Sequence, residues 1–184
     1  MEWLKINSNT YNKIQYSGNG KIVFYFLSPK PFVSINDDDN NYDYEVIPVK
    51  VDKKLCLYDL KQLVLKLQKE YDKSDDVNYF IFNGKKYWFD KETRVGLVNS
   101  LNVQQSVGQT NTILWFDDIS VNVSIVYVKE FLKNLELYAI ECFNVTQNHI
   151  IEINALKDMD DMFNYNVTTG YPEPIEFDVN EVIE

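Results

Sequence analysis

The sequence is poor in the residues that build covalent or metal-bound scaffolds. Its 184 residues include two cysteines, Cys56 and Cys142, and a single histidine, His149. Two cysteines so far apart exclude a disulfide scaffold and form no metal-binding motif, and we expect a reducing, cytoplasmic place of synthesis. The longest apolar run, residues 22–27, is much shorter than the roughly 20 residues of a membrane span. The first residues also lack the apolar core of a secretory signal, so we expect no membrane segment and no leader.

Positive charge is scarce as well. The net charge is −10, and Arg94 is the only arginine beside 17 lysines. Residues 1–74 carry 11 lysines and 10 acidic residues, a sum of +1, whereas residues 75–184 carry 7 basic and 18 acidic residues, a sum of −11. A nucleic-acid binder needs basic groups against phosphate, so this balance argues against such a partner.

The remaining composition is that of a folded protein, with 45% hydrophobic and 15% aromatic residues. In the first half, residues 13–16 and 21–27 flank a Ser-Gly-Asn-Gly turn and predict a β-hairpin. Pro29 and Pro31 predict a bend or an edge strand after it. Residues 44–51 alternate again, and Pro48 within them predicts an edge position.

Residues 55–71 change to helical spacing and predict one amphipathic helix. The polar stretch 72–76 that follows is the most plausible division of the chain. We therefore expect a β-rich attachment module with one helix at residues 1–74 and a second α+β domain at residues 75–184.

The second half begins with the clearest turn signal, Asn83-Gly84 between the aromatic runs 77–82 and 85–89, which predicts a hairpin. Asp90 is expected to cap a helix through residue 101. A second strand pair is expected at residues 112–116 and 119–125. The predicted fold class is thus α+β, a β-rich N-terminal part followed by hairpin, helix, hairpin and one long helix.

The long helix is expected at residues 126–156, which contain neither glycine nor proline. Nine positions recur at spacings of three and four, and seven of them are apolar. They are Val128, Leu132, Leu135, Ala139, Cys142, Thr146, His149, Ile153 and Leu156. Two readings stay open, one continuous helix or two helices with a kink near Asn144.

No combination of residues forms a recognisable catalytic, metal or cofactor motif. His149 lies on the apolar line of the long helix, so we interpret it as a buried or half-buried structural residue. Residues 37–43 have the oxygen spacing of a calcium loop, but Tyr42 replaces the required glycine and Pro48 the final glutamate. The carboxylates at 117–118 and 158–161 are expected in solvated turns and at a helix end. We predict no enzyme activity and no cofactor.

The aromatic hairpin allows two readings. Its five rings either fill the core with some half exposed, or present outward rings to a protein or sugar partner; they are Phe80, Phe82, Tyr87, Trp88 and Phe89. Arg94 could pair with Asp90 one turn earlier. As the sole arginine it could instead hold a fixed ion pair or stack on a ring, or be an ordinary solvated side chain.

Four segments in a fixed order resemble a domain of unknown function found in tailed bacteriophages, whose members lie among tail-fibre and virion structural proteins. The segments read NGKKYWFDKETRVGL (83–97), GQTNTILWF (108–116), LELYAIECFNVTQNHIIEINAL (135–156) and TTGYPEPIEF (168–177). Its signature positions are matched by Tyr87, Trp88, Asp90, Thr93, Arg94, Leu137, Tyr138, Cys142, Asn144, His149, Gly170, Tyr171 and Pro172. The resemblance covers about half of the chain, residues 83–177.

The resemblance implies a virion context and no particular chemistry. We expect a bacteriophage virion structural protein, an adaptor or head-fibre, tail-fibre or tail-associated component that binds other phage structural proteins and forms a homo-oligomer. Its expected location is the virion, after synthesis in the host cytoplasm. The expected partner-binding residues are Tyr87, Trp88, Phe89, Arg94 and Tyr171.

Two other functions remain open at this point. An assembly chaperone for a fibre protein, absent from the mature particle, would also suit an acidic chain with exposed rings. A small enzyme or sugar-binding module could use the aromatic surface around Trp88.

Overall fold

The computed structural model describes residues 3–7, 13–16, 23–31, 44–52 and 54–178. These residues form two compact units. Unit 1 comprises residues 1–74 and 145–170, and unit 2 comprises residues 75–144 and 171–184. The division after Ser74 falls inside the predicted 72–76 stretch. The second division, after Asn144, falls inside a helix, so each unit is built from two separate stretches of chain.

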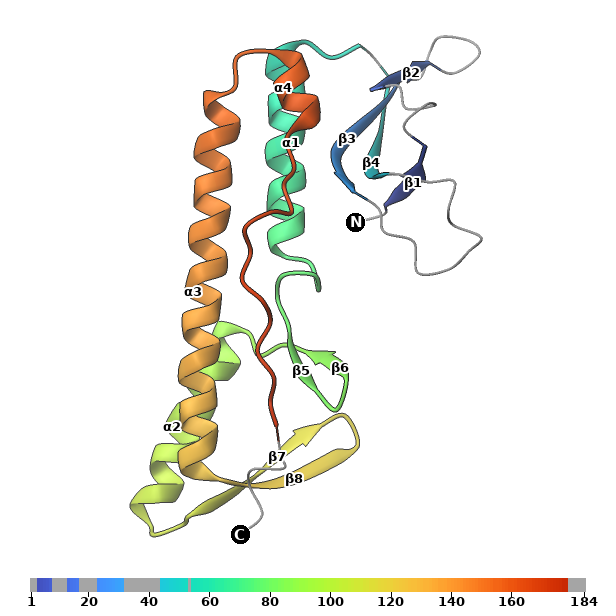
Figure 1. The fold of residues 1–184 in the computed structure, drawn as a ribbon. Coiled ribbons are helices and arrows are strands. Elements are labelled where there is room, and N and C mark those ends of the chain that lie inside the picture. The colour runs from blue at the N-terminus through green and yellow to red at the C-terminus, as the bar shows by residue number, and fades with distance from the viewer. Residues whose placement is uncertain (1–2, 8–12, 17–22, 32–43, 53, 179–184) are drawn as a thin grey trace. The chain divides into compact units, whose positions relative to one another are not determined.

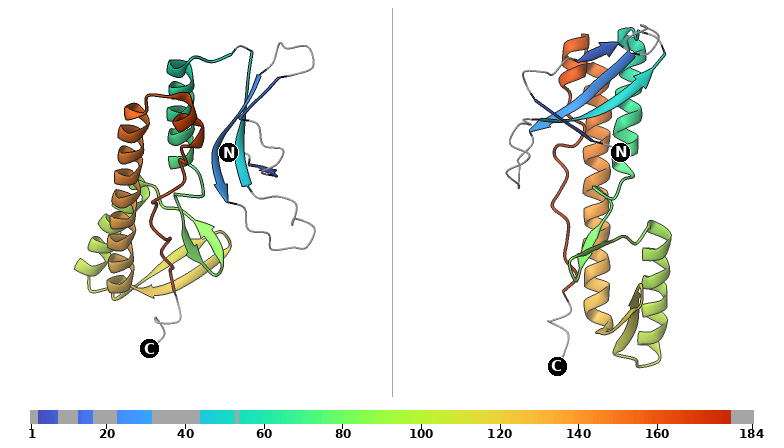
Figure 2. Two further views of the ribbon diagram at one scale, coloured as in Figure 1. Left: turned by 45° about the horizontal axis from the view of Figure 1, so that its top comes forward. Right: turned by 90° about the vertical axis from the view of Figure 1, so that its right-hand side faces the viewer.

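Unit 1 contains a four-stranded antiparallel sheet in the order β1-β4-β3-β2 (Figures 1 and 2). The strands are β1 (Leu4–Ile6), β2 (Ile14–Tyr16), β3 (Val23–Pro31) and β4 (Tyr44–Val51). The predicted hairpin of the first half is confirmed by the pairing of β2 with β3. A register shift between Leu27 and Lys30, where Ser28 has a φ of 51°, confirms the predicted bend near Pro29.

The predicted edge position of residues 44–51 is wrong, because β4 lies between β1 and β3. The proline is tolerated because β1 is short and pairs only with residues 44–46 of β4. Pro48 lies beyond that pairing, so its missing N–H removes no hydrogen bond to β1. The calcium-like spacing at residues 37–43 lies outside the described residues.

The helices of unit 1 bury apolar side chains, and one of them contacts the sheet. Helix α1 (Leu57–Asp72) confirms the predicted amphipathic helix and buries Leu60, Val64, Leu67 and Tyr71. The short α4 (Met159–Asn164) lies beside α1 (Figure 1). Tyr25 of β3 stacks on Phe163 of α4 at 5.8 Å between ring centroids, and its hydroxyl accepts a hydrogen bond from the Leu55 N–H at 2.7 Å.

Unit 2 confirms the predicted order of hairpin, helix, hairpin and long helix. Its elements are β5 (Phe80–Phe82), β6 (Lys85–Tyr87), α2 (Lys91–Ser106), β7 (Asn111–Phe116), β8 (Ile119–Ser124) and the first part of α3 (Ile125–Ala155). Asp90 caps α2 by accepting the Thr93 N–H at 2.7 Å, which lowers the pKa of its carboxyl. Of the two readings of the long helix, the continuous one is confirmed.

The core of unit 2 is a cluster of aromatic rings centred on Phe116. Its ring lies 4.3 Å from that of Phe82 and 5.5 Å from that of Phe177. Phe177 belongs to a C-terminal segment that pairs in parallel with β5, and Ile81 exchanges backbone hydrogen bonds with Ile175 and Phe177. None of the described helices is long and apolar enough to cross a membrane.

Two glycines of unit 2 differ in what an added methyl group would meet. Gly84 has a φ of +73° in the β5–β6 turn, whereas Gly96 lies in α2, where a Cβ would have no atom within 4 Å. We expect Gly84→Ala to lower the free energy of unfolding by about 1 kcal/mol, because an alanine is strained at positive φ. Gly96→Ala should raise it by about 0.5–1 kcal/mol.

Urea unfolding of both variants measures these changes. Since the two substitutions add the same methyl group, equal effects of either sign would contradict the assigned turn.

Candidate functional site

The five residues expected to bind a partner all lie in unit 2. Tyr87, Trp88 and Phe89 are half-buried. Phe89 packs against Phe80 at 5.0 Å between centroids. The Tyr87 hydroxyl donates to Asp117 Oδ2 at 2.8 Å, and this hydrogen bond raises the pKa of Tyr87. The rings therefore fit the core reading with a half-exposed margin, and their role in partner binding stays a prediction.

Arg94 is not a solvated side chain. Only 8% of its side chain is exposed, and its Nε donates to Glu136 Oε2 at 2.7 Å. Its Nη1 donates to the Phe89 carbonyl at 2.7 Å, and the guanidinium lies 5.3 Å from the centroid of the Trp88 ring. The single arginine thus joins α2, the hairpin and α3, using the forked donor geometry that lysine lacks. Its ion partner is Glu136, so of the open readings the fixed ion pair is confirmed.

Tyr171 is half-buried at the start of the C-terminal segment. It has interactions within the chain. Its role in partner binding stays a prediction.

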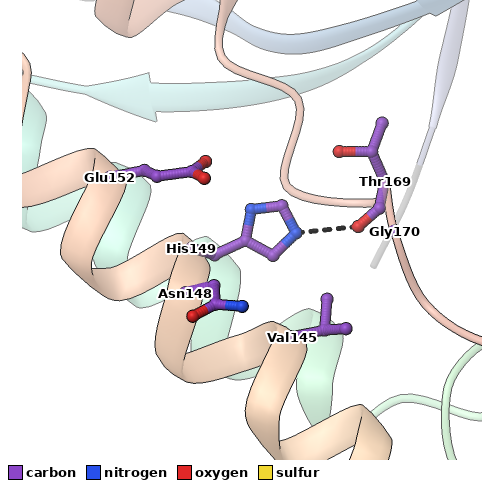
Figure 3. A pocket seen from close by; sticks show the side chains of 6 residues that line it. All are labelled: Val145, Asn148, His149, Glu152, Thr169 and Gly170. Carbon is purple, nitrogen blue, oxygen red and sulfur yellow. Dashed lines mark hydrogen bonds between the residues drawn. The ribbon is translucent and has the colours of Figure 1, made fainter.

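A polar pocket of about 250 Å³ lies in unit 1, where α3 meets the segment after α4 (Figure 3). It is lined by Val145, Asn148, His149, Glu152, Thr169 and Gly170. The expected burial of His149 is confirmed, and its Nε2 lies 2.9 Å from the Thr169 carbonyl oxygen. Its Nδ1 lies 2.6 Å from the Tyr165 hydroxyl, which donates to Glu152 Oε2 at 2.7 Å.

The hydrogen bonds of this pocket fix where its protons can lie. A carbonyl only accepts, so Nε2 of His149 carries a hydrogen. Tyr165 has one hydroxyl proton for two neighbours, Nδ1 and Glu152. Both contacts are hydrogen bonds only when a further proton sits on Nδ1 or on the Glu152 carboxyl. With both ring nitrogens engaged, the histidine ties α3 to residues 165–169 and offers no free nitrogen to a substrate or metal.

The carboxylates singled out in the sequence are placed separately. Asp117 lies in the β7–β8 turn with a φ of 51° and binds Tyr87. Asp158 caps α4 by accepting the Asp161 N–H at 2.8 Å, and Asp160 pairs with Lys13. Across the described ranges, no group of three or more histidine, cysteine or acidic side chains could hold a metal ion.

Large exposed apolar side chains also lie on β7, whose residues were not among the expected partner-binding residues. Trp115 and Ile113 are 67% and 60% exposed, and their cross-strand neighbours are Ser120 and Asn122. We call Ile113 and Trp115 the β7 outer face. The signal was present, because β7 is apolar on both faces, with Leu114 and Phe116 buried on the other side.

The Tyr87–Asp117 hydrogen bond gives a prediction about ionisation. We expect Asp117→Asn to lower the pKa of Tyr87 toward its ordinary value of about 10, because it removes the hydrogen bond from the hydroxyl to a carboxylate and, with it, the negative charge beside the ring. Stability contributed by this pair is present below about pH 10 and is lost as the pH rises through the raised pKa. The tyrosine ¹³Cζ shift followed through an alkaline titration measures it, and Asp118→Asn, one residue away, should leave it unchanged.

The pocket of unit 1 gives a prediction about stability. Tyr165→Phe removes the hydroxyl between His149 and Glu152, so we expect the free energy of unfolding to fall by about 1–2 kcal/mol. Tyr58→Phe is the matched control, because Tyr58 is exposed on α1. Loss of its hydroxyl should change the free energy of unfolding by less than about 0.5 kcal/mol. Equal urea midpoints for the two variants would contradict a structural role of the pocket.

Comparison with known proteins adds no assignment to this geometry. No protein-family model, no curated protein and no solved structure matches the chain. The resemblance of residues 83–177 to the phage domain therefore stays a prediction from the sequence.

Proposed function

We propose that the chain is a structural protein of a tailed bacteriophage particle. In this role it is an adaptor or a fibre- or tail-associated component that joins other structural proteins, and it works as a homo-oligomer. Two things support the proposal, the resemblance of residues 83–177 and the exposed apolar surface of unit 2.

The β7 outer face is the single observation on which the proposal depends most. An exposed tryptophan beside an exposed isoleucine favours a protein contact, because large apolar side chains contribute most when a partner removes them from water. Both residues belong to the segment 108–116, one of the four that resemble the phage domain. The polar neighbours Ser120 and Asn122 supply hydrogen-bonding groups beside the two apolar side chains.

The charge distribution suits assembly from a soluble subunit. Residues 75–184 carry a net charge of −11, and like charges keep free subunits apart until a specific surface engages. Net charge keeps the subunit in solution, and the β7 outer face supplies the apolar contact with a partner.

The test is quantitative mass spectrometry of purified particles of the phage that encodes the chain. We expect a fixed copy number compatible with the symmetry of a head, neck, tail or fibre. Presence in infected cells without presence in particles would overturn the virion role and favour the assembly chaperone, which leaves before maturation.

A variant connects this outcome to the surface. Trp115→Ser should reduce incorporation into particles at least about tenfold, because it removes the central apolar contact of the β7 outer face. Val107→Ser is the matched control, since Val107 is 71% exposed at the end of α2. Equal incorporation of both variants would assign attachment to another surface.

A further inference from the structure

Helix α3 carries a second apolar face on the side away from the core of unit 2. Its core side in this unit buries Leu135, Tyr138 and Cys142. Leu137, Ile140 and Phe143 are nevertheless 57%, 48% and 58% exposed. At 3.6 residues per turn these three lie within an arc of about 120°, roughly opposite the buried side. A helix that is apolar on two sides is normally covered on both.

The exposed face continues into a groove between α2 and α3. Helix α2 buries few side chains, chiefly Arg94 and Leu101, and leaves Val95 and Val98 exposed. The groove has a volume of about 340 Å³ and is lined by Arg94, Val95, Val98, Asn102, Lys129, Leu132, Lys133 and Glu136. Ile140 and Phe143 follow Glu136 by four and seven residues, so they extend the same side of α3 beyond the groove.

The spacing along this face is symmetric about its middle. Lys133, Leu137, Ile140 and Asn144 are separated by four, three and four residues, and their order is polar, apolar, apolar, polar. Read in the opposite direction, the face presents the same spacing and the same polarity. An antiparallel copy of the helix therefore places Leu137 opposite Ile140 and Lys133 opposite Asn144, and the three-four spacing is that of helices packed side by side.

From this self-complementarity we propose that α3 pairs with α3 of a second copy of the chain, antiparallel, about a two-fold axis between Leu137 and Ile140. In that arrangement the Phe143 side chain of each copy lies against α3 of its partner, on the side of the helix that carries Glu136. This position is at the end of the partner's α2–α3 groove. The inference deepens the homo-oligomer of the proposed function by naming its surface. It depends on no phage role.

The exposed apolar area of this face is comparable with the apolar share of a standard dimer interface. Val95, Val98, Leu137, Ile140 and Phe143 are each between 37% and 58% exposed. Together they present on the order of 450 Å² of apolar surface, and because a little over half of a typical interface is apolar this corresponds to roughly 800 Å² per partner, the standard share.

Three cationic side chains that line the groove already have partners within the chain. Arg94 holds Glu136, and Lys133 lies 3.0 Å from Glu130. Lys129 donates to Gln105 at 2.6 Å. When a second copy covers the face, each of these charges therefore keeps a partner. This matters because burial of a charge is most costly when the charge has no partner.

The test compares the full chain with two single substitutions by sedimentation equilibrium. We expect the wild type to be a dimer at micromolar concentration and Ile140→Glu to raise the dissociation constant at least about tenfold. Ile113→Glu is the matched control, because it places the same charge on a comparably exposed isoleucine of the β7 outer face and should remain dimeric. Circular dichroism of each variant checks that both stay folded.

Cross-linking tests the direction of the helices. In a Cys56→Ser background, Lys133→Cys mixed with Asn144→Cys should cross-link through a short bis-maleimide at least several-fold more than either variant alone, because equivalent positions of the two copies lie about 16 Å apart along the antiparallel helices. More cross-linking of Lys133→Cys alone than of the mixture would overturn the antiparallel arrangement.

A wild type that stays monomeric up to about 100 μM, or Ile140→Glu dimerising like the wild type, would overturn the inference. Either result leaves the virion measurement untouched, and absence from virions leaves the dimer measurement untouched, so the two proposals fail separately.

Discussion

The contacts of the Phe116 ring hold unit 2 together. Phe116 ends β7 and touches rings from the first hairpin, from the loop before α2 and from the C-terminal segment, namely Phe80, Phe82, Tyr87, Phe89 and Phe177. These segments are short, and a two-stranded hairpin has little stability alone. Their arrangement therefore depends on the shared burial of rings, which contributes more than hairpin pairing can.

The aromatic core also explains why α2 can remain poorly covered. Unit 2 is closed by two hairpins and α3, so α2 is held chiefly by Leu101 and by the hydrogen bonds of Arg94 to Glu136 and to the Phe89 carbonyl. A helix attached in this way leaves apolar side chains on its outer side. The exposed apolar side chains of β7, α2 and α3 take no part in this ring cluster.

Local signals predicted most of the elements, because turns and caps are decided by a few adjacent residues. Asn83-Gly84 defined a hairpin and Asp90 the start of α2. The position of β4 within its sheet was mispredicted, since it depends on the length of β1 and not on Pro48 alone. The ion partner of Arg94 could not be predicted from local patterns either, because Glu136 is 42 residues away in the sequence. Exposed apolar residues were missed because periodicity identifies one apolar face and not a second.

The interleaved order of the two units has a consequence for synthesis. Unit 1 needs residues 145–170, and unit 2 needs the segment whose Phe177 enters the ring cluster. Neither unit can be completed on the ribosome until nearly all 184 residues have emerged, although domains usually fold in the order in which they are made. The nascent chain thus keeps its β-hairpins and rings uncovered for most of translation, which makes early protection by chaperones more important for this protein than for one with consecutive domains.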